Sequence, residues 1–252
     1  MIMGRLAGKR ILVTGAGGLL GADLARGFAA EGADLILTTR TAAKLEALAA
    51  EIRTYGVGAA TIAADFTAQN DCDRLADAAW TAFGGIDVVL FSSQPANPHL
   101  GDLLSTTDAV WEEQQKSIVW GPFRTMRRLA PKMMAAGGGS IITLTSSTGT
   151  EPIPGFGAYG MAKAALWTLT LYMAAEWGKY GIRANALQPG LIATGDNAAQ
   201  LEESAKQNGA LGRTALGRVG RNSECLGAAI YLASDESSFT TGQCLKVNGG
   251  RL

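Results

Sequence analysis

Short apolar runs alternate with alanine-rich stretches along the whole chain, and this alternation limits the fold more than any other feature. The apolar runs have the length of buried strands, and the alanine-rich stretches can form helices of several turns. Such alternation is typical of a parallel sheet with helices on both faces. We expect strands at residues 10–15, 33–39, 58–65, 87–93, 140–146, 182–188 and 244–249. We expect helices near residues 18–31, 41–54, 68–83, 108–136, 158–180, 196–208 and 222–233.

The 252 residues contain no linker, internal repeat or low-complexity tract that would divide them. We therefore expect one doubly wound α/β domain of the Rossmann type over residues 1–252, with a parallel sheet of about seven strands. In such a sheet a ligand binds beyond the carboxyl ends of the strands. The residues that follow each expected strand are therefore the candidates for a functional site.

Charge and cysteine content argue against several classes of function. Lys and Arg together number 22, as do Asp and Glu, so no net charge favours nucleic acid or an anionic membrane. Three widely spaced cysteines and the single His99 form neither a metal-ligand set nor a disulfide framework. No apolar run approaches the roughly 20 residues of a membrane span. We expect a soluble cytoplasmic protein that binds no metal, nucleic acid or membrane.

The first expected strand runs into a glycine-rich stretch, TGAGGLLG, at residues 14–21. A phosphate group needs free backbone N–H groups at a helix N-terminus and glycines where the backbone comes close to it. Two sets of glycines fit this requirement: Gly15, Gly18 and Gly21, or Gly15, Gly17 and Gly21. A glycine-rich corner between strand and helix with no ligand would have the same sequence.

The end of the second expected strand bears on which dinucleotide could bind. An acidic residue at this position pairs with the ribose 2′-hydroxyl of NAD(H), whereas an arginine suits the 2′-phosphate of NADP(H). The residues here are Thr38, Thr39 and Arg40, with no carboxylate. We therefore expect NADP(H) rather than NAD(H). The alternative is that Arg40 is a solvated residue at the start of a helix.

Tyr159 and Lys163 are four residues apart in an expected helix, so their side chains share one helix face. A nearby ammonium group stabilises the phenolate and so lowers the tyrosine pKa from about 10. Ser146 ends the preceding expected strand, and its hydroxyl could bind a substrate oxygen while Tyr159 transfers a proton. Together these residues predict proton transfer at a carbonyl or hydroxyl oxygen.

With these motifs in place, the chain resembles the short-chain dehydrogenase/reductase family over nearly its whole length. The matching segments are TGAGGLLG (14–21), DFT (65–67), WEEQQKSIVWGPF (111–123), SIITLTSS (140–147), YGMAK (159–163), IRANALQPGLIAT (182–194) and LASDESSFTTGQCLKVNGG (232–250). The resemblance implies that Ser146, Tyr159 and Lys163 are catalytic, with Tyr159 as general acid or base. Lys163 would also hold the nicotinamide ribose.

The resemblance also implies where the dinucleotide lies. It would contact Gly15, Gly18, Leu20, Gly21, Arg40, Asp65, Phe66, Ser92, Tyr159, Lys163, Pro189, Gly190, Ile192 and Thr194. Asp65 would meet the adenine, and Ile192 and Thr194 would fix the carboxamide. Residues 195–215 resemble the segment that covers the substrate.

Three positions depart from the family pattern. Leu19 stands where shorter-chain members carry glycine, and the segment Phe91-Ser92-Ser93-Gln94 replaces the usual Asn-Asn-Ala-Gly. Ile118 replaces the asparagine that completes the usual catalytic tetrad and holds a water beside the lysine. An isoleucine side chain cannot hold that water, so Ser117, a neighbouring carbonyl or solvent would have to replace it. We expect phosphates over residues 18–21, with Leu19 turned away from them.

These observations predict an NADP(H)-dependent oxidoreductase that interconverts a ketone and a secondary alcohol. One alternative is a cofactor-binding sensor or partner subunit without turnover, and another is an epimerase or lyase that oxidises its substrate transiently. The apolar helix expected at 158–180 predicts a homo-oligomer, a tetramer by the resemblance, unless its apolar residues are ordinary core. Residues 151–156, with Gln94, Pro95 and Leu191, predict an apolar pocket for a medium-sized cyclic or aromatic ketone.

Overall fold

The expected parallel sheet is confirmed by the computed structural model, which describes residues 4–95 and 101–251. Its seven strands are β1 (Arg10–Thr14), β2 (Asp34–Thr39), β3 (Ala59–Ala63), β4 (Val88–Phe91), β5 (Gly139–Leu144), β6 (Ile182–Pro189) and β9 (Cys244–Val247). Their order is β3-β2-β1-β4-β5-β6-β9, and all neighbouring strands are parallel. Separately, β7 (Ile192–Ala193) pairs with β8 (Gly220–Arg221).

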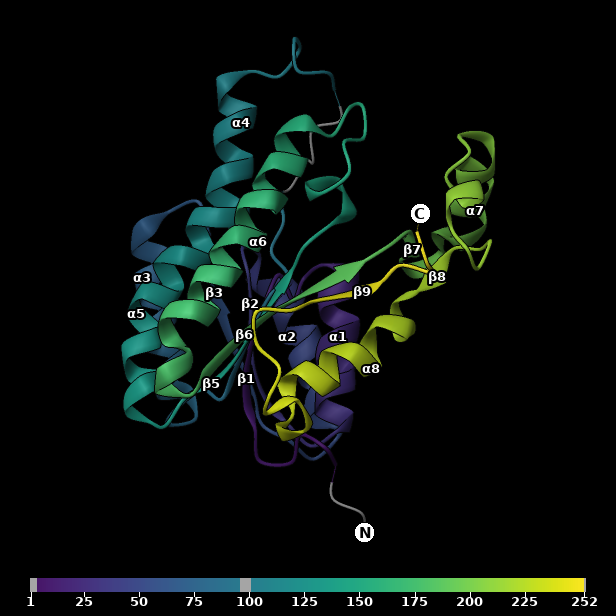
Figure 1. Cartoon of the computed structure of the whole chain (residues 1–252). Coiled ribbons are helices and arrows are strands. Elements are labelled where there is room, and N and C mark those ends of the chain that lie inside the picture. Colours follow the sequence, from purple (N-terminus) through teal and green to yellow (C-terminus); the bar gives the residue numbers. More distant parts are fainter. Residues whose placement is uncertain (1–3, 96–100, 252) are drawn as a thin grey trace.

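Helices cover both faces of the sheet (Figure 1). One face carries α1 (Leu19–Ala30), α2 (Ala42–Arg53) and α8 (Asn222–Ala233), and the other carries α3 (Gln69–Ala82), α5 (Gly121–Ala135) and α6 (Gly157–Trp177). Two further helices, α4 (Asp108–Gln115) and α7 (Ala198–Gln207), project beyond the sheet at the upper end of Figure 1. The arrangement is the doubly wound one that the sequence predicts.

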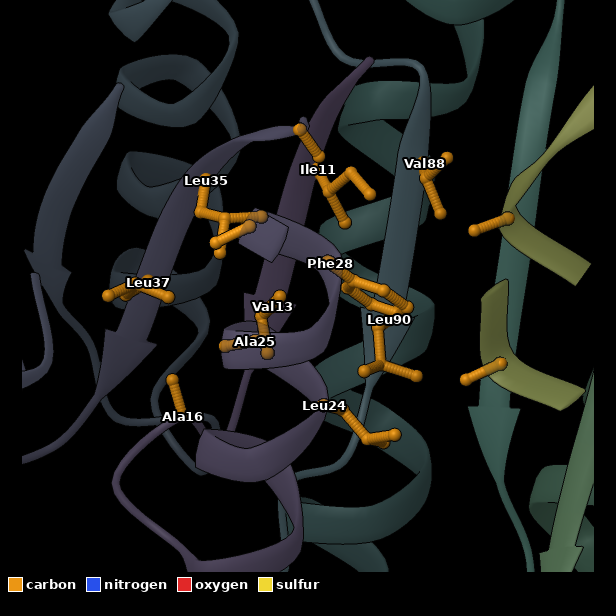
Figure 2. Close-up of a cluster of buried hydrophobic side chains, with 14 of the residues drawn as sticks. Ile11, Val13, Ala16, Leu24, Ala25, Phe28, Leu35, Leu37, Val88 and Leu90 are labelled. Atoms are coloured by element: carbon orange, nitrogen blue, oxygen red, sulfur yellow. The ribbon is translucent and has the colours of Figure 1, made fainter. Parts of the chain in front are cut away.

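The central strands supply two cores because successive strand side chains point to opposite faces. Ile11 and Val13 of β1 pack in the core beneath α1 and α8, whereas Leu12 between them packs in the core beneath α3 and α5. Figure 2 shows Leu24 and Phe28 of α1 lying over the side chains of β1, β2 and β4. Burial on both faces explains why these strands are continuous apolar runs rather than alternating ones.

The helix expected at 108–136 is divided. A π-helical turn, Lys116–Trp120, lies between α4 and α5 and contains Ser117 and Ile118. Pro122 follows directly, and a proline has no N–H to donate to the carbonyl four residues earlier, which is that of Ile118. The Ile118 carbonyl therefore cannot accept the usual helical bond from the residue four positions further on.

Candidate active site

A groove of about 660 Å³ lies at the carboxyl ends of the strands, where the chain leaves β1, β2, β4, β5 and β6. The neighbours β1 and β4 form the switch point of the strand order, which is where open α/β sheets bind ligands. Of the residues expected at the site, the groove is lined by Gly15, Gly18, Leu20, Gly21, Arg40, Asp65, Phe66, Ser92, Ser146, Tyr159, Pro189, Gly190, Ile192 and Thr194. Lys163 does not line the groove but lies buried behind Tyr159.

The glycine turn joins β1 to α1, and its glycines serve different purposes. Gly15 has a φ of +67°, and a Cβ added there would lie 2.8 Å from the Ser92 backbone. A Cβ on Gly21 would lie 2.5 Å from the Gly15 oxygen. The turn itself therefore requires these two glycines. A Cβ on Gly18 would lie 3.3 Å from the Gly15 oxygen, so the packing there is tight but less restrictive than at Gly15 and Gly21.

The N-terminus of α1 fits an anionic group. Gly18 is the N-cap residue, and no side chain caps the first turn of the helix. The first N–H groups of a helix have no partner within it, and they carry the positive end of the helix dipole. Because these groups face the groove, the residues present suit a phosphate at this point.

Leu19 is the first residue of α1, and its side chain lines the groove. That Leu19 turns away from a bound phosphate stays a prediction, although the residue lines the groove. Helical side chains lean towards the N-terminus of their helix, which directs this one over the turn rather than along the helix. Across the groove, a Cβ added to Gly195 would lie 3.7 Å from Leu19 Cδ1, so the space between the two residues is about the size of one methyl group.

Ser92 holds the turn against the end of β4. Its backbone N–H donates to Thr14 Oγ1 at 3.1 Å, and its hydroxyl donates to the Thr14 carbonyl at 2.6 Å. These two bonds brace β1 against β4. The serine of the departing segment Phe91 to Gln94 thus supplies a brace at this point of the sheet.

The end of the groove beyond β2 is open and positively charged. Arg40 is exposed and makes no hydrogen bond or ion pair with the described part of the chain, and Lys44 lies four residues further on. Apart from Asp65, the described residues that line the groove include no acidic side chain. Asp65 Oδ1 accepts from the N–H and the hydroxyl of Thr67, both at 2.9 Å. Lys44 was missed from sequence, because Arg40 precedes α2 and helical spacing does not relate the two residues.

Ser146 is oriented by a neighbour that the sequence did not reveal. Its Oγ accepts from Thr148 Oγ1 at 2.9 Å and from the Thr148 N–H at 3.3 Å. A serine hydroxyl can accept twice and donate once. Because Thr148 fills the acceptor positions, the Ser146 proton is left to donate to Tyr159 or to a substrate oxygen.

Tyr159 and Lys163 lie on one face of α6, as expected, but burial dominates their titration. Desolvation raises the pKa of Tyr159 to about 12, although a hydrogen bond with Ser146 opposes this rise. Lys163 is buried, its Nζ donates to the Leu144 carbonyl at 2.6 Å, and burial lowers its pKa to about 7. The expectation that Lys163 depresses the tyrosine pKa is therefore wrong for the protein's own groups. The ammonium is itself disfavoured by burial, and its Nζ lies 5.5 Å from the Tyr159 ring centre.

Close packing brings Ser146 and Tyr159 together. Gly160, directly after Tyr159, lies so near the turn after β5 that an added Cβ would be 2.6 Å from the Thr148 oxygen. Gly149 approaches α6 from the other side, where a Cβ would lie 2.8 Å from the Ala164 nitrogen. The two glycines let the turn and the helix touch backbone to backbone.

Ile118 occupies the place of the missing asparagine within an apolar cluster. It is buried with Ala162 and Leu166 of α6, and Tyr159 packs against the same cluster. Its side chain offers no polar atom towards Lys163, whereas Ser117 lines the groove. The backbone carbonyl is therefore the only acceptor that Ile118 itself offers, and Pro122 cannot donate to it.

Within the described ranges, no group of three or more His, Cys, Asp and Glu side chains could hold a metal ion. His99 lies outside those ranges. Among the same residues, no helix combines the length and the apolar character needed to cross a membrane.

The switch-point groove, the uncapped helix N-terminus and the Ser146–Tyr159 pair define an α/β protein built for a dinucleotide. A family model described as enoyl-(acyl carrier protein) reductase matches residues 15–251. The chain belongs to the short-chain dehydrogenase/reductase family and is an oxidoreductase of that family.

Relatives match the chain almost end to end. Galactitol 2-dehydrogenase (L-tagatose-forming) from Cereibacter sphaeroides is 39% identical over 98% of this chain and 96% of its own. Dehydrogenase/reductase SDR family member 4 from Oryctolagus cuniculus is 31% identical over 97% and 94%. The crystal structure of a gluconate 5-dehydrogenase from Burkholderia cenocepacia, in complex with NADP and tartrate, superposes with a TM-score of 0.90 at 33% identity, covering 98% of this chain and 96% of that one.

Proposed function

We propose that this protein is an NADP(H)-dependent oxidoreductase that interconverts a ketone and a secondary alcohol. The proposal rests on Ser146 and Tyr159, which are hydrogen-bonded to each other in the groove. Arg40 lines the far end of the same groove. When bound, the nicotinamide supplies or accepts the hydride. The protein's residues orient the substrate and move the proton.

Tyr159 is the proton donor in reduction. Its raised pKa keeps the phenol protonated at neutral pH, so it can give its proton to the carbonyl oxygen as negative charge develops there. Ser146 donates a hydrogen bond to the same oxygen, because Thr148 holds its lone pairs. Lys163, with a pKa of about 7, is poised to return a proton to Tyr159 at neutral pH.

The cofactor is held at both ends of the groove. The N–H groups at the start of α1 would hold the pyrophosphate, and Arg40 with Lys44 would hold the 2′-phosphate. Asp65 would meet the adenine, and Thr194 the carboxamide. The NADP bound to the gluconate 5-dehydrogenase from Burkholderia cenocepacia supports this choice of cofactor.

The first ketones to test are polyhydroxy ones, because two of the similar proteins are named for galactitol and gluconate. Medium-sized cyclic or aromatic ketones form the second class. Phe156 packs edge-on against Tyr159, with 6.3 Å between ring centres, and supplies the apolar wall that such a substrate needs.

A single substitution tests the proposal. Tyr159→Phe should lower ketone-dependent oxidation of NADPH by about 100-fold or more, because a general acid contributes roughly 10²- to 10⁴-fold to such a step. The affinity for NADPH, measured by quenching of tryptophan fluorescence, should stay nearly unchanged. Full activity in this variant would exclude Tyr159 as the acid. Failure of the unsubstituted protein to turn over any ketone while it binds NADPH would favour the sensor or partner-subunit alternative.

We also propose a homotetramer in the cytoplasm, in which residues 195–215 cover the substrate. Large apolar side chains remain exposed on α5 and α6 and in the turn before α5, namely Trp120, Phe123, Leu171 and Tyr172. A second copy of the chain would cover this face. The three cysteines are all free thiols, which suits a reducing compartment.

A further inference from the structure

A second cavity, of about 210 Å³, lies behind the turn that carries Ser146. The walls of this rear cavity come from the turn after β5, from α6, and from β6 and β9. Ser146 borders both the groove and the rear cavity, whereas Lys163 borders the rear cavity and not the groove. A water molecule in the liquid takes up about 30 Å³, so the rear cavity has room for several.

Gln188 of β6 places an unsatisfied polar group at the wall of the rear cavity. Its Oε1 accepts from the Cys244 thiol of β9 at 3.2 Å. Its Nε2 is buried and has no hydrogen-bond partner in the described part of the chain. A buried amide N–H without a partner is costly, and ordered water is the usual partner where a polar group meets a cavity of this size. Gln188 is therefore suited to bind water in the rear cavity.

The rear cavity connects the interior of the protein with its surface. Lys163 and Gln188, which line it, are only 1% and 2% exposed. Thr150 and Lys246 line the same cavity and are exposed. Water in the rear cavity can therefore exchange with solvent without passing through the groove in which a dinucleotide would lie.

Lys163 needs such a supply of water. In the proposed reaction it returns a proton to Tyr159, and it must be protonated again before the next turnover. Its Nζ donates to the Leu144 carbonyl, which has no proton to give back. Ile118 offers no polar side chain and packs in an apolar cluster with residues of α6. Of the groove and the rear cavity, only the rear cavity is bordered by Lys163.

We propose that water in the rear cavity supplies protons to Lys163 and that Gln188 positions this water. The inference rests on the proposed function, because it needs ketone reduction by Tyr159. For each ketone reduced, Tyr159 gives one proton to the substrate oxygen and takes one from the Lys163 ammonium. The Lys163 amine then takes one proton from the cavity water, which recovers it from solvent. Gln188 of β6 thus compensates for the asparagine that Ile118 replaces.

A few enclosed waters solvate an ammonium group less well than bulk water does. The proposed route is therefore compatible with the lowered pKa of Lys163, which burial causes.

The test compares the first turnover with the later ones in Gln188→Leu, using the ketone that the unsubstituted protein reduces fastest. The first turnover uses the proton already on Tyr159. Its rate, measured by stopped-flow absorbance of NADPH, should therefore equal that of the unsubstituted protein. Steady-state kcat should fall roughly tenfold, because each later turnover waits for Lys163 and Tyr159 to be protonated again. The KM for the ketone should stay nearly unchanged.

Gln114→Leu is the matched control. Gln114 is also buried, and its side-chain amide has no partner in the described part of the chain, but it lines neither the groove nor the rear cavity. This variant should keep both the first-turnover rate and kcat.

Two substitutions of Cys244 test the position of the Gln188 amide. Cys244→Val removes the donor to Gln188 Oε1 and should lower kcat by about threefold, again without slowing the first turnover. Cys244→Ser keeps a hydrogen-bond donor at this point and should restore kcat.

A crystal structure of the unsubstituted protein supplies a measurement that does not depend on activity. It should show an ordered water within hydrogen-bond distance of Gln188 Nε2, and a dry cavity would overturn the inference. A first turnover slowed as much as kcat in Gln188→Leu, or an equal loss of kcat in Gln114→Leu, would also overturn it, because the damage would then be structural.

The remaining outcomes separate the inference from the function on which it rests. Unchanged kcat in Gln188→Leu would overturn the proton route and leave the oxidoreductase proposal intact. If the unsubstituted protein reduces no ketone although water occupies the rear cavity, the proposed function fails, and the proton route fails with it.

Discussion

The two ends of the groove differ in how far water reaches them. At the catalytic end, Tyr159 and Lys163 are desolvated, and burial moves their pKa values in opposite directions, to about 12 and about 7. At the other end, Arg40 and Lys44 are exposed. The comparison shows that one groove can separate two tasks. Burial tunes proton transfer at one end, and exposed charge selects the nucleotide at the other.

The loss of ketone reduction in Tyr159→Phe is the largest effect that this comparison predicts. This substitution at the buried end should change turnover and leave nucleotide binding nearly unchanged. Substitutions at the exposed end should change binding instead.

Arg40→Ala should weaken NADPH binding by roughly 10- to 100-fold while leaving NADH binding nearly unchanged, because it removes charge-assisted hydrogen bonds to the 2′-phosphate. Isothermal titration with both nucleotides measures the two affinities. Since Arg40 is exposed, the NADPH affinity should also fall as ionic strength rises. Lys179→Ala is the control, because it removes one charge at the opposite end of α6 from Tyr159. A clear NADH preference in the unsubstituted protein would overturn the choice of cofactor.

Thr148→Val should lower kcat by about fivefold with little change in KM, because it removes one hydrogen bond that orients Ser146. Steady-state kinetics with the best ketone measure this split. The control is Thr150→Val, whose hydroxyl bonds the Ser147 carbonyl rather than Ser146. Equal losses in both variants would point to a loosened turn rather than to an oriented serine.

The pH dependence of stability should reveal the burial of Lys163. Its pKa is about 7 in the folded protein and 10.5 when unperturbed, so above pH 7 the unfolded chain binds a proton that the folded chain does not. Stability must therefore rise with pH from about 7 upwards on account of this group. Thermal midpoints between pH 6.5 and 8.5 should show a rise of a few degrees that Lys163→Met lacks. Tyr159 titrates above this window, and the cysteine thiols, which titrate near about pH 8.5 in an unfolded chain, contribute equally to both proteins. If the thermal midpoints of the unsubstituted protein and of Lys163→Met change with pH in the same way, Lys163 is hydrated in the folded protein.

Much of the fold could be predicted from the sequence. The seven main strands begin and end within a few residues of their expected positions, because apolar runs that are buried on both faces leave a strong signal. The division of the helix at 108–136 was missed. Pro122 was visible in the sequence, but the π-helical turn before it depends on how Ile118 packs against α6.

The candidate site could be predicted in part, since the expected residues line one groove apart from Lys163. Thr148 was missed because its bond to Ser146 depends on the tight turn after β5. The approach of Leu19 to Gly195 could not be predicted because the two residues lie 176 positions apart in the chain.

The sequence alone determined which groups are present: a glycine turn before a helix, an arginine without an acidic neighbour, and a serine, a tyrosine and a lysine at fixed spacing. These are local features, because strand, helix and i, i+4 geometry follow from residues that are close in the chain. Only the tertiary structure decided how those groups behave. Desolvation, which set the Tyr159 and Lys163 pKa values, and the approach of Leu19 to Gly195 both depend on segments that the fold brings together from distant parts of the sequence.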